Sequence, residues 1–249
     1  METIKNVVLA KQANCDSDKV LSYALKLTNR LGAKLTIGLC YQYEPEYLRT
    51  SAYREVNPVK EAFQYVKHEY LIDSPVDYRL VSCETEDCDR ADETLTVYLP
   101  DLYLMDKTEV HDLYSFIDRI HCPLLLLPPQ IKYHPIQHIL VVADLNEKDR
   151  DNIPLHAKSL AETFSASYEM MDIGDLSASV FDKKERKSSS LLSPKSDQRR
   201  YAHNLHDMGV PDLLVIMVKD KFFGVMKSFY GPGINLTQLL DFPVMIYKV

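Results

Sequence analysis

Two stretches of the chain repeat one strand-helix-strand pattern, and this repeat constrains the fold more than any other feature. In residues 101–128, an apolar run at 102–105 is followed by a short amphipathic segment and a second apolar run at 124–127, which a proline precedes. Near the C-terminus, strand-like segments at 212–217 and 242–247 repeat this order around a longer connection, and the last strand is again entered through a proline. The pattern predicts a chain built from two related halves.

The first half alternates strand-like apolar runs with amphipathic helical segments. Its first run, residues 4–10, is almost continuously apolar, which is typical of a strand covered on both faces of a parallel sheet. The helix that follows has a broad apolar face, and Gly32 is expected to end it. Further strands are expected at 34–41, 76–81, 102–105 and 124–127, with helices at 58–71 and before residue 98. This alternation indicates an α/β fold with a doubly wound parallel sheet and right-handed crossovers.

The proline-rich residues 128–135 are the best candidate for a domain boundary. A chain of 249 residues is long enough for two ordinary domains. We therefore predict one domain at residues 1–130 and a second, abbreviated domain at residues 136–249. Residues 174–199 are rich in Ser, Lys and Asp and too polar for a core element, so an irregular loop is expected there.

The second half opens with a strand, a helix and another strand, expected at residues 139–142, 149–164 and 168–173. The helix is predicted to bury one stripe of apolar side chains against the sheet. The residues assigned to this stripe are Leu155, Leu160, Ala161 and Phe164.

The net charge of −7 argues against a protein that binds the phosphate backbone of nucleic acids, because such proteins need clustered Lys and Arg. No stretch reaches the roughly 18 apolar residues of a membrane helix, and the N-terminal sequence has no signal-peptide pattern. We expect a cytoplasmic protein with no nucleic-acid partner and no membrane partner.

The five cysteines all lie in the first half and form no CxxC pair. Cys83 and Cys88 are close enough in sequence to form a disulfide or half of a metal site, but His or Cys partners at zinc spacing are missing nearby. Ordinary thiols in a reducing compartment are the favoured interpretation, and no metal site is predicted.

Several segments of the chain carry the likeness to a known family. In the first half these are the strand IKNVVL, the helix end and strand RLGAKLTI, the strand DLYLMDK and the ending HCPLLLLP. The second half has HILVVADLNE, HAKSLAETFSASYEMMDI, PDLLVIMVK and DFPVMIYKV at the corresponding places. Together they resemble the universal stress protein family over nearly the whole chain. The resemblance implies two tandem Rossmann-like (adenine nucleotide alpha hydrolase-like) domains, each with a parallel five-stranded sheet flanked by helices.

Many members of that family bind ATP, and the resemblance implies where a nucleotide would bind. An Asp ends the first strand near the adenine, and a glycine-rich loop after the fourth strand cradles the ribose and phosphates. In the first half, Lys11 or a neighbour takes the place of that Asp, and no glycine follows the fourth strand. Asp106, Glu109 and Asp112 would also repel phosphates. No nucleotide is expected there.

The second half keeps more of the site that the resemblance implies. Asp144 stands at the end of its first strand, and the connection after Met217 is long enough for a complete loop, although the glycine pattern is absent. The candidate nucleotide-binding residues are Asp144, Met217, Lys219, Gly231 and Gly233. The alternative is that Gly231 and Gly233 only form a turn before a helix.

No signature of an enzyme occurs in the sequence, which lacks a Walker loop, HExxH, GxSxG and GxGxxG. We expect a non-enzymatic stress-response or regulatory protein with degenerate nucleotide-binding motifs, no catalytic residues and no cofactor. The first alternative is an ATP sensor that uses the C-terminal domain alone. The second, an enzyme acting on adenylated substrates, rests on fold analogy. The expected partner of each half is the other half, in an intramolecular pseudo-dimer, and a further homodimer stays open.

Overall fold

The computed structural model describes residues 4–13, 18–41, 58–85, 90–110, 113–143, 152–172, 211–218 and 241–248. The chain divides into two compact units. One, the N-terminal unit, comprises residues 4–133, and the other, the C-terminal unit, comprises residues 134–249 with residues 1–3. Each unit contributes its own set of parallel strands and has its own buried core.

The N-terminal unit has a parallel sheet in the order β3-β2-β1-β4-β5. Its strands are β1 (Asn6–Gln12), β2 (Lys34–Tyr41), β3 (Tyr78–Glu84), β4 (Leu102–Asp106) and β5 (Leu124–Leu127). Its α-helices are α1 (Asp18–Leu31), α2 (Pro58–Val66), α3 (Asp92–Leu95) and α4 (Leu113–Arg119). A π-helical turn, Lys67–Leu71, extends α2. The predicted alternation of strands and helices and the doubly wound sheet are thus confirmed.

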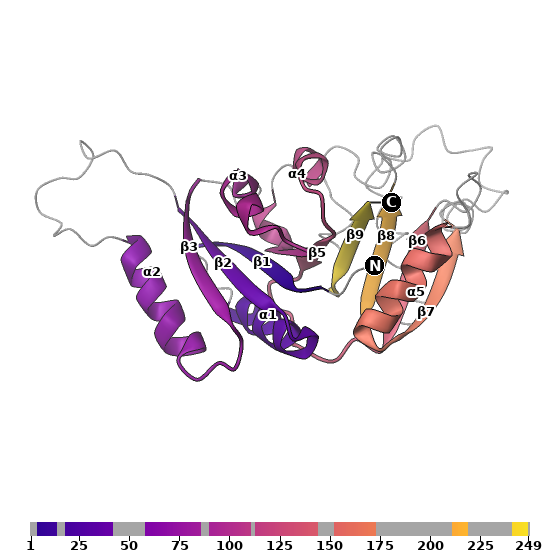
Figure 1. The fold of residues 1–249 in the computed structure, drawn as a ribbon, viewed down its shortest axis with the longest axis horizontal. Helices are drawn as coiled ribbons and strands as arrows, with labels where there is room; N and C mark the ends of the chain where they lie inside the picture. Colours follow the sequence, from indigo (N-terminus) through magenta and orange to yellow (C-terminus); the bar gives the residue numbers. More distant parts are fainter. Residues whose placement is uncertain are drawn as a thin grey trace, which may run out of the picture. The chain divides into compact units, whose positions relative to one another are not determined.

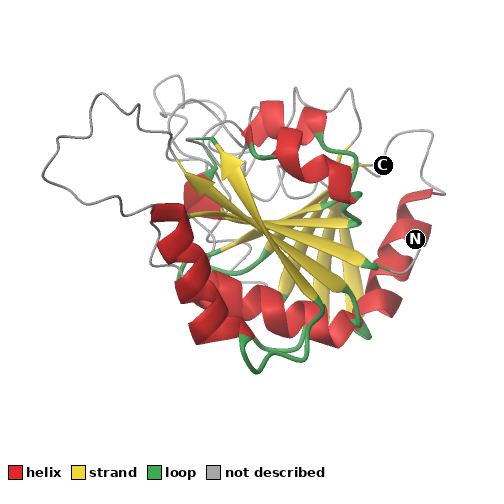
Figure 2. Ribbon diagram, turned by 60° about the vertical axis from the view of Figure 1, so that its left-hand side comes forward, coloured by secondary structure: helices red, strands yellow, loops and turns green. Residues whose placement is uncertain are grey.

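The helices of the N-terminal unit cover both faces of its sheet. Figure 1 shows α1 and α2 on one side and α3 and α4 on the other, and Figure 2 shows helices on both sides of the strands. The arrangement follows from right-handed crossovers, because the chain moves outward from β1 to β3 and then returns past β1 to β4 and β5. The central strand β1 is consequently buried over its whole middle part.

The C-terminal unit repeats the inner part of this topology. Its described strands form a parallel sheet in the order β9-β8-β6-β7, which matches the order β5-β4-β1-β2 of the N-terminal unit. The elements are β6 (His138–Ala143), α5 (Asn152–Phe164), β7 (Ser167–Asp172), β8 (Leu213–Val218) and β9 (Val244–Lys248). The predicted loop at 174–199 lies outside the described residues.

Two details of the sequence interpretation are wrong. Leu155 was assigned to the buried stripe of α5, but it is 65% exposed. Ala157, Leu160, Ala161 and Phe164 form the buried stripe, and at 100° per residue Leu155 points to the opposite side of the helix. The third strand begins at Tyr78 and not at residue 76, since Val76 is buried in the turn before β3.

An aspartate carboxylate fastens the start of the first strand in both units. In the N-terminal unit, the backbone N–H groups of Lys5 and Asn6 donate to Oδ2 of Asp101 at 2.8 and 2.9 Å. In the C-terminal unit, Gln137 and His138 donate to Oδ2 of Asp212 at the same two distances. Each aspartate lies directly before a central strand, so one carboxylate holds two strand starts in register.

The first helix of each unit also ends in the same way. Gly32 after α1 and Ser165 after α5 adopt left-handed conformations, with φ of 62° and 54°. Each donates its backbone N–H to the carbonyl three residues earlier, Asn29 or Glu162, at 3.1 Å. Glycine adopts this conformation without strain, whereas serine does so at some cost. The predicted role of Gly32 is confirmed.

Replacing Asp101 by alanine is expected to lower the free energy of unfolding by about 2 kcal/mol, because two charge-assisted hydrogen bonds are lost. Asp101→Asn is the matched control, since its amide oxygen can still accept from both N–H groups that share Oδ2. Urea unfolding measures the free energy, and hydrogen exchange at Lys5 and Asn6 shows where protection is lost. Equal stability of the alanine and wild-type proteins would show that the carboxylate does not fasten the strands.

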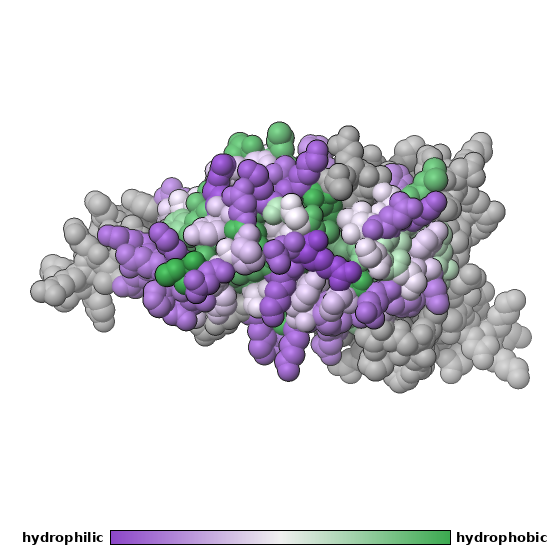
Figure 3. Space-filling view, turned by 60° about the horizontal axis from the view of Figure 1, so that its bottom comes forward, coloured by the Kyte–Doolittle hydropathy of each residue, from purple (hydrophilic) through white to green (hydrophobic). Residues whose placement is uncertain are grey.

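The surface of the described residues is mostly hydrophilic on the face that Figure 3 shows, with hydrophobic groups in small separate areas. Within the part of the chain that the structure describes, no helix is both long enough and apolar enough to cross a membrane.

Candidate functional site at the carboxyl ends of β1 and β4

The candidate site lies where β1 and β4 of the N-terminal unit end side by side. Ala10 pairs with Met105 in the parallel register of these strands, so Lys11 and Asp106 follow at the same level. In parallel α/β sheets, ligands bind at the carboxyl ends of the strands, in a crevice that opens where the connections from strand to strand reverse their direction along the sheet. This sheet has such a point at β1 and β4, since the chain runs outward from β1 and then returns to β4.

Charged side chains fill this edge of the sheet. Four charged residues at this edge are buried, and Glu109 is only 3% exposed. The four are Lys11, Asp106, Lys107 and Glu109. Charged residues are rarely buried unless opposite charges or hydrogen bonds compensate them. Two lysines and two acids give formal charges that cancel within the cluster. We call these four residues the charged cluster.

The backbone after β4 fixes the acidic members of the charged cluster. Oδ1 of Asp106 accepts hydrogen bonds from the Thr108 backbone N–H at 2.8 Å and from the Thr108 hydroxyl at 2.7 Å. This side-chain turn begins a 3-10 turn, Lys107–Glu109, which turns Glu109 back toward β1. The backbone N–H of Gln12 then donates to Oε2 of Glu109 at 3.1 Å. A carboxylate from the segment after β4 therefore closes the end of β1.

This arrangement can hold the two strand ends together, and it is unsuited to a phosphate. The N–H group of Gln12 already donates to the Glu109 carboxylate, so a phosphate at this edge would have to displace a buried acid. Between Met105 and Val110 there is no glycine to allow close backbone approach. Among the described residues, no three His, Cys, Asp or Glu side chains are placed to hold a metal ion.

The nucleotide-binding site predicted for the second half stays a prediction, because the structure describes only one of its residues. Met217 lies on β8, is buried, and pairs in register with Tyr247 of β9. Asp144, Lys219, Gly231 and Gly233 lie outside the described residues. Of the predicted set, the structure therefore places only Met217, as a core residue of the sheet.

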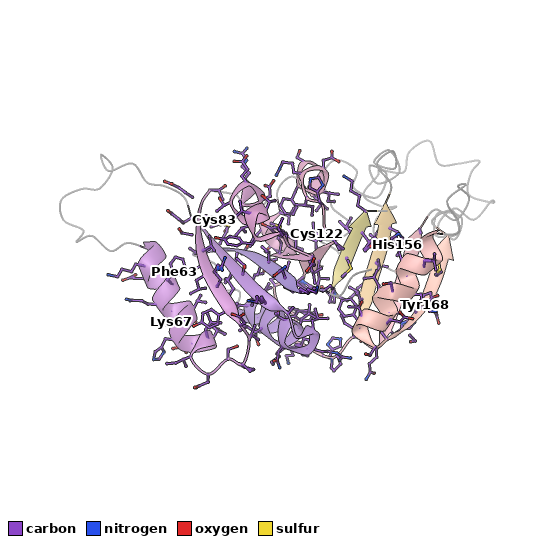
Figure 4. All side chains as sticks on the ribbon, in the orientation of Figure 1. Phe63, Lys67, Cys83, Cys122, His156 and Tyr168 are labelled. Carbon is purple, nitrogen blue, oxygen red and sulfur yellow. The ribbon has the colours of Figure 1, made fainter. Side chains whose placement is uncertain are left out.

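A histidine-tyrosine pair next to Met217 was missed by the sequence analysis. The side chains of His156 on α5 and Tyr247 on β9 share a hydrogen bond, with 3.1 Å between Nδ1 and the hydroxyl oxygen. Their ring centroids are 5.3 Å apart, and Figure 4 shows His156 on α5. Burial lowers the pKa of the His156 imidazole and raises the pKa of the Tyr247 hydroxyl. Both rings are therefore neutral at pH 7, and the pair joins α5 to β9.

The lowered pKa of His156 predicts a loss of stability in mild acid. Below about pH 6.5 the unfolded histidine binds a proton that the folded histidine resists, so the free energy of unfolding falls as pH drops through this window. Replacing His156 by glutamine should remove this contribution. Urea unfolding of both proteins at about pH 7.5 and about pH 5.5 measures it. An unchanged difference between the two pH values in the variant would contradict the assignment.

An ion pair also joins the two helices on one face of the N-terminal unit. Nε of Arg119, at the end of α4, donates to Oδ2 of Asp92 at 2.9 Å, and a second guanidinium nitrogen donates to Oδ1 at 3.3 Å. The Asp92 side chain is 5% exposed. Two-point pairing of this kind fixes orientation as well as distance, so α3 and α4 are held as one cover.

Comparison with known proteins gives similarity of fold without similarity of sequence. No protein-family model matches the chain, and no curated protein matches it. A universal stress protein from Archaeoglobus fulgidus DSM 4304 has a similar structure at 9% identity, with a TM-score of 0.54 over 97% of this chain and 96% of that chain. A functionally unknown protein from Pseudomonas aeruginosa PAO1 is 12% identical, with a TM-score of 0.52 over 98% of this chain and 92% of that chain.

A candidate universal stress protein from Pseudomonas aeruginosa UCBPP-PA14 is also similar, at 12% identity, with a TM-score of 0.55 over 98% of this chain and 93% of that chain. These likenesses show that the chain has the Rossmann-like α/β fold of universal stress proteins. The resemblance predicted from the sequence is confirmed at the level of the fold.

Proposed function

We propose that this chain is a non-enzymatic stress-response or regulatory protein, made of two universal-stress-protein-like domains, whose N-terminal domain does not bind nucleotide. The likeness in fold to universal stress proteins supports the stress-response role. The two domains share a strand order, and Asp101 and Asp212 make equivalent hydrogen bonds in their own domains. Both observations support two copies of one fold. No catalytic group is assigned in this proposal.

The observation that carries the proposal is the hydrogen bond from the Gln12 N–H to Glu109. It joins the ends of β1 and the segment after β4, which are the two places where the family resemblance implies adenine and phosphate contacts. A nucleotide at this edge would have to displace a buried carboxylate and bring its own negative charge beside Asp106. The N-terminal domain is therefore a structural or regulatory domain.

Any adenine nucleotide is proposed to bind in the C-terminal domain, with Asp144 near the adenine and residues 217–233 near the phosphates. Equilibrium binding of labelled ATP to the full chain tests this, with Asp144→Ala and Glu109→Gln as paired variants. The proposal predicts either no binding at millimolar ATP or binding that Asp144→Ala removes and Glu109→Gln leaves intact. Binding that survives Asp144→Ala and changes with Glu109→Gln would contradict it.

The non-enzymatic assignment has a separate test. Purified protein is incubated with ATP, and released phosphate and AMP are measured against buffer. The proposal predicts turnover no faster than in buffer alone, and turnover that is faster and is lost in Asp144→Ala would replace it with an ATPase assignment.

We further propose that the two domains form an intramolecular pseudo-dimer through their last strands, β5 and β9, as the family resemblance implies. Linkage in one chain raises the effective concentration of such a pairing. Alternate backbone N–H groups of β5 point toward β4 and away from it. Slow hydrogen exchange at every β5 residue from Leu124 to Leu127 is expected, whereas fast exchange at alternate residues would contradict the pairing.

A further inference from the structure

Two cysteines that are distant in sequence lie on neighbouring strands of the N-terminal unit. Cys40 on β2 is the register partner of Cys83 on β3. Register partners on parallel strands point to the same face of a sheet, and both residues are buried. The sequence brings Cys83 close to Cys88, whereas the fold places it beside Cys40, which is 43 positions earlier.

The face on which the two thiols lie is the one covered by α3. A Cβ atom added at Gly38, two residues before Cys40 on β2, would lie 2.6 Å from Cδ1 of Leu95 and 3.1 Å from Sγ of Cys83. Leu95 is the last residue of α3, so its side chain packs over Gly38 next to the Cys83 thiol. Figure 4 shows Cys83 on β3 beside α3.

The two thiols interact with each other in their present state. Cys83 and Cys40 share a side-chain hydrogen bond, which, together with burial, raises the pKa of the Cys83 thiol. No covalent bond joins the two cysteines, and the strand register places them side by side. This placement is the first geometric requirement for an intramolecular disulfide.

The strand geometry allows the bond and makes it reducible. Neighbouring strands lie about 4.8 Å apart, within the range of about 4.4–6.8 Å between Cα atoms joined by a disulfide. The preferred Cβ separation of about 3.8 Å is shorter than this spacing, so closing the bond must draw β2 and β3 together locally. Strained disulfides are more easily reduced than structural ones, and they are typical of regulatory sites.

We propose that Cys40 and Cys83 form a reversible dithiol-disulfide site that a peroxide oxidises. The thiolate of one cysteine attacks a peroxide oxygen and forms a sulfenic acid, and the O–O bond breaks to release water. The second thiol attacks the sulfenic sulfur, forms the S–S bond and releases another water molecule. The dithiol loses two electrons and two protons, and one equivalent of hydrogen peroxide is reduced to two water molecules. A dithiol reductant reverses the change.

The rate of oxidation is controlled by access. Burial and the raised pKa keep the Cys83 thiol protonated at neutral pH, so oxidation requires local opening of the cover. Leu95 is the buried cover residue that the structure identifies. Truncating it to alanine should speed oxidation by about tenfold or more, because a buried leucine contributes strongly to the stability of the closed state.

The test uses the full chain treated with hydrogen peroxide, then blocked with N-ethylmaleimide and digested without reduction. The proposal predicts a linked peptide pair that contains Cys40 and Cys83, lost on treatment with dithiothreitol before digestion. Cys122 is the internal comparison, since burial raises the pKa of its thiol to about 12 and no cysteine lies on β4, the strand that pairs with β5 after it. A Cys83→Ser variant should leave Cys40 open to N-ethylmaleimide after unfolding.

The Leu95→Ala variant gives a second, kinetic readout if the linked peptide forms slowly in the wild-type protein. Appearance of the Cys40–Cys83 peptide in the variant at about ten times the wild-type rate or more supports the proposal. The proposal is overturned if both proteins are treated with enough peroxide to oxidise Cys122, and after unfolding Cys40 and Cys83 are modified by N-ethylmaleimide and not linked. Linkage of Cys83 only to another chain or to another cysteine would overturn it as well.

Discussion

Replacing Glu109 by alanine is expected to lower the free energy of unfolding by about 3 kcal/mol. Glu109 is buried, and its Oε2 accepts the Gln12 N–H at the end of β1. Truncation would leave the Gln12 N–H without its acceptor. It would also leave two buried lysines, Lys11 and Lys107, with one acid, Asp106, in the charged cluster. Urea unfolding followed by far-UV circular dichroism measures the change.

The matched control is Glu109→Gln, which keeps an oxygen for the Gln12 N–H but removes the charge and replaces the other oxygen by an NH2 group. It should lose less stability than the alanine variant. Hydrogen exchange at Gln12 should accelerate in Glu109→Ala and stay nearer to the wild-type rate in Glu109→Gln. Wild-type stability in the alanine variant would show that Glu109 does not close this edge of the sheet.

Replacing Phe116 by alanine is expected to cost about 4 kcal/mol, because a fully buried aromatic side chain leaves a cavity. The Phe116 ring on α4 meets the ring of Tyr103 on β4 edge-on, with 5.1 Å between the ring centroids. The Arg119 guanidinium, which pairs with Asp92, lies 6.0 Å from the centroid of the same ring. Phe116 therefore anchors α4 to the sheet and supports the link to α3.

Two variants make the Phe116 prediction specific. Phe116→Leu keeps most of the buried volume and should cost only about 1 kcal/mol. Phe164→Ala removes an equally buried ring from α5 in the C-terminal unit, and its loss should be of similar size. A loss under about 1 kcal/mol in Phe116→Ala would contradict the packing described for α4.

Much of the fold could be predicted from the sequence because its elements have strong local patterns. The continuously apolar β1 region and the proline-led β5 and β9 regions were placed within a few residues of their observed positions. Gly32 marked the end of α1 through its need for a left-handed conformation. These features depend on neighbouring residues, which is why periodicity and turn chemistry could reveal them.

The parts that sequence reasoning missed depend on contacts between distant residues. The hydrogen bonds from the Lys5 and Asn6 N–H groups to Asp101, which we call the Asp101 clamp, join residues 96 and 95 positions apart. The placement of Cys40 beside Cys83 depends on the register of β2 with β3. The repeated Pro-Asp-Leu before β4 and β8 was a signal for the clamp. Leu155 was misassigned because an apolar residue near a helix start does not by itself show which face it occupies.

Of the candidate site, only its unsuitability for a phosphate could be predicted from the sequence. Asp106 and Glu109 were expected to repel phosphates, and the structure shows both buried at the carboxyl edge of the sheet. The sequence does not show that Glu109 accepts the Gln12 backbone N–H. It also does not show that Lys11 and Lys107 are buried, because lysine side chains are normally exposed to solvent.

We propose that the charged cluster closes the edge of the N-terminal domain at which the family resemblance implies a nucleotide. Photoaffinity labelling of the full chain with an azido-ATP probe, followed by peptide mapping, tests this most directly. We expect no specific label on peptides from residues 4–133, and we expect any label that excess ATP prevents to be confined to residues 134–249. ATP-preventable label on the peptide that carries Lys11 or on the one that carries Lys107 would contradict it.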